Sequence, residues 1–185
     1  MKMKFLKQEP LFYHVIGCCY FDHWPGFYEG VAWDIFSEAM DDVQDEANLT
    51  TRSFVLMNNH YHWLLNHDFT QDSGIVEWFH ELVNFKYLHY FQADFVGHAF
   101  QQEIEIIPIT NIKNYQTVYK YIYRNPVTAG LCEKAENYPY SSLAGVLGRT
   151  QLDFKCEDNM NLLQSPNFIL EWLNNENIIS KYILH

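Results

Sequence analysis

Residues 53–65 read Ser-Phe-Val-Leu-Met-Asn-Asn-His-Tyr-His-Trp-Leu-Leu, and the fold can be worked out from this stretch outward. The segments on both sides of Asn58-Asn59 are apolar and rich in β-formers, which is the pattern of strands. Two adjacent asparagines are typical of a tight turn. The stretch therefore predicts two strands, at residues 50–57 and 61–66, joined by a short turn.

His60 and His62 stand where the second of these strands begins. Because side chains alternate faces along a strand, the two imidazoles point to one side and Tyr61 to the other. Two imidazoles side by side can hold a divalent metal. The same short pattern also fits two polar residues on the solvated face of a half-buried strand. The pair becomes a site only with a partner elsewhere in the chain.

The hydrophobic pattern of the remaining chain alternates between strands and helices. It predicts a strand at 11–20, a helix at 30–47, a helix near 74–92, a loop at 97–100 and a strand at 103–109. A third helix, near 111–124, is expected to stop at Asn125-Pro126, because the residue before proline is steered away from helical angles. The order β-α-β-β-α-β predicts an α+β fold of the ferredoxin-like (RRM-like) split βαβ type, with an antiparallel sheet. C-terminal helices are expected near 140–144 and 165–182.

Length and composition indicate one globular domain. The chain has 185 residues, of which 48% are hydrophobic and 17% aromatic. Its apolar stretches are shorter than a membrane span, and the N-terminus has no apolar segment of signal-peptide length. We therefore expect a cytoplasmic protein without membrane contact. Cys18, Cys19, Cys132 and Cys156 form no C-x-x-C pair, so a zinc ribbon is not supported and reduced thiols are expected.

The charge balance is acidic. The net charge is −11, and arginine occurs only at positions 52, 124 and 149. Neutralisation of phosphates by basic side chains supplies most non-specific affinity for nucleic acid. This composition argues against a protein that holds nucleic acid through charge, and any nucleic-acid hypothesis must account for it.

A second group of candidate functional residues lies in the third predicted helix. Tyr121 and Asn125 are four positions apart, so they share a face if helical geometry persists to the end of the helix. A phenol is neutral near pH 7, but it can act as a nucleophile once it loses its proton beside a cation that polarises a phosphate. The carbonyl oxygen of Asn125 could complete a coordination shell. Both residues also have ordinary structural explanations: Tyr121 could pack in the core, and Asn125 could simply end the helix before proline.

Several stretches, in order along residues 11–145, resemble the blocks of the single-tyrosine HUH transposases. Residues 56–65, Leu-Met-Asn-Asn-His-Tyr-His-Trp-Leu-Leu, resemble their metal-binding strand with its His-hydrophobic-His signature. Residues 121–131, Tyr-Ile-Tyr-Arg-Asn-Pro-Val-Thr-Ala-Gly-Leu, with Tyr-Pro-Tyr-Ser-Ser at 138–142, resemble the nucleophile helix and its exit. Phe-Tyr-His-Val at 12–15 and Gly-His-Ala-Phe-Gln at 97–101 resemble two further blocks. The most similar subgroup is the REP-associated tyrosine transposases of bacteria.

The resemblance implies metal-dependent cleavage and rejoining of single-stranded, usually hairpin-bearing DNA. His60 and His62 would hold Mg²⁺ or Mn²⁺, with Asn125 as the third protein ligand. Tyr121 would attack the scissile phosphate to form a 5′-phosphotyrosine link, and no nucleotide cofactor would be required. The resemblance also implies a catalytic domain over residues 1–150, with 151–185 as a C-terminal helical extension of the same domain, and a possible homodimer.

Other residues of the third helix have weaker claims to a function. Tyr119 and Tyr123 are rival nucleophiles, although each lies two residues from Tyr121 and off its helical face. Lys120 and Arg124 flank Tyr121 and could contact phosphates, or they could be solvated charges that suit the helix dipole. Histidines outside the His60-x-His62 pair receive no functional role: His14, His23, His67, His80, His89, His98 and His185.

The sequence departs from the family after the block at 97–101. Residues 101–107 read Gln-Gln-Glu-Ile-Glu-Ile-Ile, where the family commonly carries an arginine-containing stretch. A second hypothesis is therefore a domesticated, non-transposing member that binds nucleic acid or protein. A third is an unrelated metal-dependent hydrolase, for which Glu103 or Glu105 could serve as the water-activating base.

Overall fold

The structure is a computed structural model, and it describes residues 12–47, 49–69, 73–91, 98–158, 161 and 165–175. Its elements follow the predicted order, with a short 3₁₀ turn, η2, that the sequence did not indicate. In chain order they are β1 (Phe12–Cys19), α1 (Val31–Glu46), β2 (Thr50–Leu56), β3 (His60–Asn66), α2 (Ile75–Phe91), β4 (Phe100–Ile109), α3 (Ile112–Thr128), η2 (Ala135–Asn137), α4 (Leu143–Val146) and α5 (Pro166–Asn174).

The strands form one antiparallel four-stranded sheet in the order β2-β3-β1-β4. This is the strand order of a split βαβ unit, in which two β-α-β halves interleave so that β1 and β3 lie at the centre. The predicted α+β, ferredoxin-like fold with an antiparallel sheet is confirmed. β2 and β3 are joined through Asn58-Asn59, as the sequence predicted.

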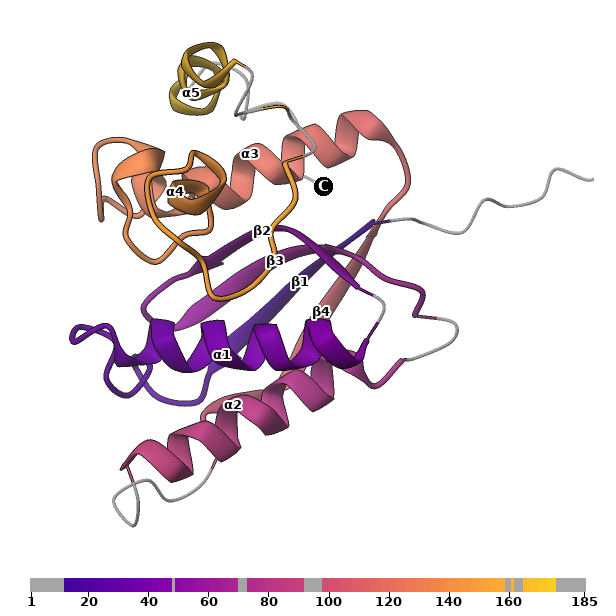
Figure 1. The fold of residues 1–185 in the computed structure, drawn as a ribbon, viewed down its shortest axis with the longest axis vertical. Helices are drawn as coiled ribbons and strands as arrows, with labels where there is room; N and C mark the ends of the chain where they lie inside the picture. Colours follow the sequence, from indigo (N-terminus) through magenta and orange to yellow (C-terminus); the bar gives the residue numbers. More distant parts are fainter. Residues whose placement is uncertain are drawn as a thin grey trace, which may run out of the picture.

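Helices α1 and α2 pack together on one face of the sheet, as Figure 1 shows. The strand residues that point toward these helices are large and apolar. They include Phe54, Tyr61 and Trp63, each fully buried. The ring of Tyr61 lies 5.9 Å from that of Phe36 in α1 and 5.7 Å from that of Phe79 in α2, measured between centroids. This aromatic layer is the main hydrophobic core.

Helix α3 covers part of the opposite face, which we call the site face (Figure 1). Residues that point the other way along the strands, such as Val55 and Leu64, pack against Tyr119, Ile122 and Tyr123 of α3. The alternation of side chains along each strand supplies both layers, because neighbouring residues in a strand face opposite sides.

Helix α3 continues through Asn125 and Pro126 to Thr128, so the prediction that it stops at Asn125-Pro126 is wrong. Proline removes only its own N–H donor, and here it lies in the last turn of the helix. The following residues close that turn, since the N–H groups of Ala129 and Leu131 donate to the carbonyls of Asn125 and Pro126 at 2.9 Å. Gly130, at φ 74°, then ends the helix in the left-handed conformation that glycine tolerates.

The chain after residue 150 packs onto the same unit. Phe154 joins the main core, and Glu157 N donates to the carbonyl of Thr51 on the edge strand β2 at 3.0 Å. Helix α5 lies against α3. Residues 176–182, where the last helix was expected to continue, lie outside the described residues. None of the helices in the described ranges is long and apolar enough to cross a membrane.

Gly17 is a close-approach position at the centre of the sheet. It pairs with Tyr61 across β1 and β3, and an added Cβ would overlap the Tyr61 ring. We expect Gly17→Ala to lower the free energy of unfolding by about 1–3 kcal/mol, because the buried ring has no free volume to move into. Urea denaturation measures the change. Cys18→Ala, at the next position but on the other face, is the control, and an unchanged midpoint for Gly17→Ala would contradict this packing.

Candidate active site

The two predicted metal-binding histidines lie together on the site face. Their ring centroids are 5.0 Å apart, and in the register of the sheet His60 pairs with Cys18 and His62 with Ile16. The Nδ1 atom of His60 lies 2.8 Å from Oδ1 of Asn59, a hydrogen bond in which the ring nitrogen donates. In a neutral imidazole this leaves the Nε2 lone pair of His60 available.

Helix α3 brings Tyr121 and Asn125 to the same place. Because the helix persists through Asn125, the two residues share one face, and that face meets β3. Asn125 Nδ2 lies 2.7 Å from His62 Nε2, and the ring of Tyr121 lies 5.3 Å from that of His62. The structure therefore brings together all four residues that the sequence assigned to the catalytic centre.

The rival tyrosines of α3 point elsewhere. Tyr119 and Tyr123 are 0% and 1% exposed and belong to the core beneath the helix, whereas Tyr121 is only half-buried. The hydroxyl of Tyr123 is hydrogen-bonded to Ser142 Oγ at 3.0 Å. Burial also raises the pKa of both buried phenols well above the ordinary value. Neither is placed to act as a nucleophile.

His14 is a site residue that the sequence analysis missed. Its Nε2 lies 3.1 Å from Nδ1 of His62, and its ring is 6.0 Å from that of Tyr121. It lies on β1, two positions from Ile16, which pairs with His62. The signal was its place in a predicted strand, but only the register between β1 and β3 shows that it reaches the pair.

The three imidazoles are held neutral by their surroundings. Burial lowers the pKa of His14 to about 4 and also lowers that of His60. The pKa of His62 lies well below its ordinary value, chiefly through burial and then through the neighbouring His14 and His60. A histidine must be neutral to bind a metal, so the site is ready to accept one near pH 7.

The donor set fits a divalent metal that keeps part of its shell for other ligands. His60 and His62 can each offer Nε2, and the amide of Asn125 could turn its oxygen toward them, since O and N of an amide are interchangeable in such a position. Among the described residues, no group of three or more His, Cys, Asp or Glu side chains could hold a metal. The amide of Asn125, beside His62, is placed to serve as a third protein ligand, which would leave positions for water and phosphate oxygens.

Lys120 and Arg124, the predicted phosphate contacts, lie on a different face of α3. Lys120 is 1% exposed, and its Nζ donates to the carbonyls of Trp172 and Asn175 at 2.6 and 2.7 Å. Arg124 is 5% exposed and donates to the carbonyl of Leu173 at 3.2 Å. The two cations thus bind the C-terminal carbonyls of α5. The idea that they are solvated charges is wrong, and a contact with phosphate stays a prediction.

Exposed acids lie on the edge strand beside the site, and exposed aromatics lie in the loop after β1. Glu103 and Glu105 of the edge strand β4 are exposed, and Glu105 pairs with Ile16 on the site face. Tyr20 and Tyr28, each 70% exposed, lie in the loop after β1, together with the 39% exposed Phe21. That loop is tied to the turn before His60, because Cys19 N donates to the carbonyl of Asn59 at 2.7 Å.

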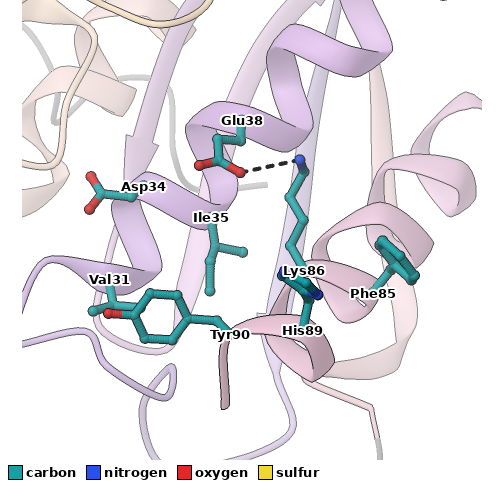
Figure 2. A pocket seen from close by; sticks show the side chains of 8 residues that line it. All are labelled: Val31, Asp34, Ile35, Glu38, Phe85, Lys86, His89 and Tyr90. Atoms are coloured by element: carbon teal, nitrogen blue, oxygen red, sulfur yellow. Dashed lines mark hydrogen bonds and ion pairs between the residues drawn. The ribbon is translucent and has the colours of Figure 1, made fainter. Parts of the chain in front are cut away.

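A separate hollow of about 400 Å³ lies between α1 and α2, on the face opposite the histidines. Figure 2 shows Tyr90 and Ile35 facing it, with Glu38 and Lys86 joined across the two helices. The hollow shares no residue with the histidine cluster, and we do not include it in the site.

The fold is shared with solved structures, although the sequence has no match among family models or curated proteins. The structure of a REP-associated tyrosine transposase bound to a REP hairpin aligns with a TM-score of 0.62, covering 85% of this chain and 92% of that one at 15% identity. A candidate transposase from Deinococcus radiodurans R1 aligns more weakly, with a TM-score of 0.43 at 16% identity over 63% of this chain and 92% of that one. At such identities the likeness is one of fold, and the first comparison shows that this chain has the fold of a REP-associated tyrosine transposase.

The attachment of α5 to α3 can be tested through Lys120. We expect Lys120→Ala to lower the free energy of unfolding by about 1.5–3 kcal/mol, because it removes a buried charged donor from two carbonyls at the end of α5. Chemical denaturation followed by circular dichroism measures the loss. Lys134→Ala, at an exposed lysine, is the matched control. Equal stability of the two variants would contradict the role given to Lys120.

Proposed function

We propose that this protein is a metal-dependent transferase that cleaves and rejoins single-stranded, hairpin-bearing DNA through a tyrosine-linked intermediate. One observation carries the proposal: within a single chain, the half-buried ring of Tyr121 lies 5.3 Å from that of His62, which is hydrogen-bonded to Asn125. The fold shared with a transposase that was solved with a REP hairpin supports the choice of substrate.

In this proposal His60, His62 and Asn125 hold Mg²⁺ or Mn²⁺, which would polarise the scissile phosphate and stabilise its developing charge. The phenol oxygen of Tyr121 attacks the phosphorus atom and gives up its proton to water. The bond from phosphorus to the 3′ oxygen breaks, and that oxygen takes a proton from water, which leaves a 5′-phosphotyrosine and a free 3′-hydroxyl. A 3′-hydroxyl from another end reverses the step and returns a proton to Tyr121. The bond energy stays in the phosphotyrosine, so no nucleotide cofactor is needed.

The neighbours of Tyr121 support its selection as the nucleophile. Tyr119 and Tyr123 are held in the core, and Lys120 and Arg124 are bound to α5. Tyr121 and the histidines belong to one chain, so a monomer would contain a complete site. A homodimer stays a prediction, as does a location in the bacterial cytoplasm, where DNA would be reached.

The acidic composition favours a mode of binding that uses stacking more than charge. Aromatic side chains stack on unpaired bases, contributing about 1–3 kcal/mol per base, with little dependence on sequence. Tyr20 and Phe21 are exposed just after Cys19, whose N–H donates to the turn that leads into His60. This supports a single-stranded substrate, whose bases are free to stack.

The charge distribution also favours a second candidate, a non-transposing member of the family that binds DNA or protein. It rests on the exposed Glu103 and Glu105 beside the site and on the burial of Lys120 and Arg124. The metal-hydrolase hypothesis gains less support. Glu105 lies on the site face, but β1 separates it from His62, so it is not placed as a base beside the histidines.

Tyr121 can be tested directly. We expect Tyr121→Phe to abolish a covalent protein–DNA adduct with labelled single-stranded hairpin DNA in Mn²⁺ or Mg²⁺, because the variant lacks the attacking oxygen. Denaturing gel electrophoresis detects the adduct. Tyr119→Phe, which removes a buried hydroxyl from the same helix, is the control and should keep it. Cleavage without an adduct in the wild type would indicate a hydrolase, and binding without cleavage a non-transposing binder.

The aromatic side chains can be tested by binding. We expect Tyr20→Ala to weaken single-stranded DNA binding by about 1–3 kcal/mol, with little change in its salt dependence. Fluorescence anisotropy at several salt concentrations measures both quantities. Phe85→Ala removes a similarly exposed ring from α2, on the face opposite the histidines, and should have no effect (Figure 2). An equal loss in Phe85→Ala would rule out a local stacking surface.

A further inference from the structure

A chain of hydrogen bonds runs from α3 through β3 to β1. Asn125 Nδ2 is 2.7 Å from Nε2 of His62, and Nδ1 of His62 is 3.1 Å from Nε2 of His14. Both nitrogens of His62 are therefore engaged, one by a residue on each side. His14 has no role in the proposed reaction.

The proton positions along this chain are restricted to two arrangements. A neutral imidazole carries one N–H and one lone pair. Either His62 donates from Nδ1 to His14 and keeps a lone pair on Nε2, or His14 donates to Nδ1 of His62 and the proton of His62 sits on Nε2. Only the first arrangement lets His62 bind a metal through the nitrogen that faces Asn125.

Burial makes His14 the group that decides between these arrangements. His62 is 2% exposed and His14 is 4% exposed, so water does not supply a partner to the Nδ1 atom of His62. The backbone fixes the distance, because His14 and His62 lie on paired central strands with Ile16 opposite His62. A histidine on β1 thus faces Nδ1 of His62 at a buried position.

We propose that His14 is a positioning residue that accepts the Nδ1–H of His62 and so presents the Nε2 lone pair of His62 to the metal position. Metal-binding histidines commonly donate their other ring nitrogen to such an acceptor, which fixes both the ring orientation and the tautomer. The inference rests on the proposed metal site but not on the DNA chemistry. The ring of His14 is 6.0 Å from that of Tyr121, and its Nε2 is committed to His62.

The first measurement needs no variant. In ¹⁵N-labelled, metal-free wild-type protein, long-range ¹H–¹⁵N correlation spectra report which nitrogen of each histidine ring carries the proton. We expect His62 to be protonated on Nδ1 and His14 to have a bare Nε2. A proton on Nε2 of His62 would overturn the proposal, even if every variant failed to fold.

The second measurement titrates Mn²⁺ into the folded protein by calorimetry. We expect His14→Phe, which keeps a buried ring but has no acceptor, to weaken Mn²⁺ binding by about 10- to 100-fold. His14→Gln offers an acceptor oxygen and should recover part of the affinity. His80→Phe is the control for loss of a buried histidine, because His80 bonds Tyr61 on the other face of the sheet, and it should leave Mn²⁺ binding unchanged.

The outcomes separate this inference from the proposed function. An unchanged Mn²⁺ affinity in folded His14→Phe overturns the inference, whether or not the wild type forms a DNA adduct. Weaker Mn²⁺ binding with partial rescue by His14→Gln supports it, even if no adduct is found. In that case the proposed metal site would be supported and the proposed strand-transfer chemistry would be contradicted.

Discussion

The antiparallel register between β1 and β3 is the constraint on which the rest of the molecule depends. It pairs Ile16 with His62 and Gly17 with Tyr61, so the two faces of the central strands receive different chemistry. One face gives Tyr61 and Trp63 to the aromatic core under α1 and α2, and the other gives the histidines to α3. A slip by one residue would exchange these faces, placing imidazoles under α1 and α2 and the largest rings toward α3. The fold and the site are therefore specified by the same pairing.

The faces of helix α3, which covers part of the site face of the sheet, also make different contacts. Its buried face, with Tyr119 and Tyr123, packs on the sheet, and a neighbouring face, with Lys120 and Arg124, binds the end of α5. The rotation of the helix is thus fixed by two unrelated sets of contacts. Tyr121 is left facing the histidines because the residues on either side of it are held elsewhere. This gives α5, which resembles no family block, a role in orienting the candidate nucleophile.

Local rules predicted most of the architecture, whereas the resemblance to the single-tyrosine transposases singled out four residues of the site. Alternation along 53–65 predicted the two strands and the shared face of His60 and His62, and the i, i+4 spacing predicted that of Tyr121 and Asn125. What the sequence missed depends on distant contacts. His14 required the strand register, and the burial of Lys120 and Arg124 required the carbonyls of α5, about fifty residues away in the chain. The rule for residues before proline failed because it is a local steric preference, and the contacts of α3 with the sheet and with α5 outweigh it here.

The distribution of charge bears on how such a protein would choose its substrate. Duplex DNA offers phosphates and stacked bases, and affinity for it is gained mainly by releasing counterions through basic side chains. This chain has a net charge of −11, two of its cations are bound to its own backbone carbonyls, and acids occupy the exposed edge strand beside the site. Such a surface repels a uniform polyanion, but it penalises an unpaired strand less, because exposed rings can stack on the bases. Electrostatic repulsion would then disfavour the surrounding duplex more than single-stranded segments, so the acidity is compatible with the proposed chemistry.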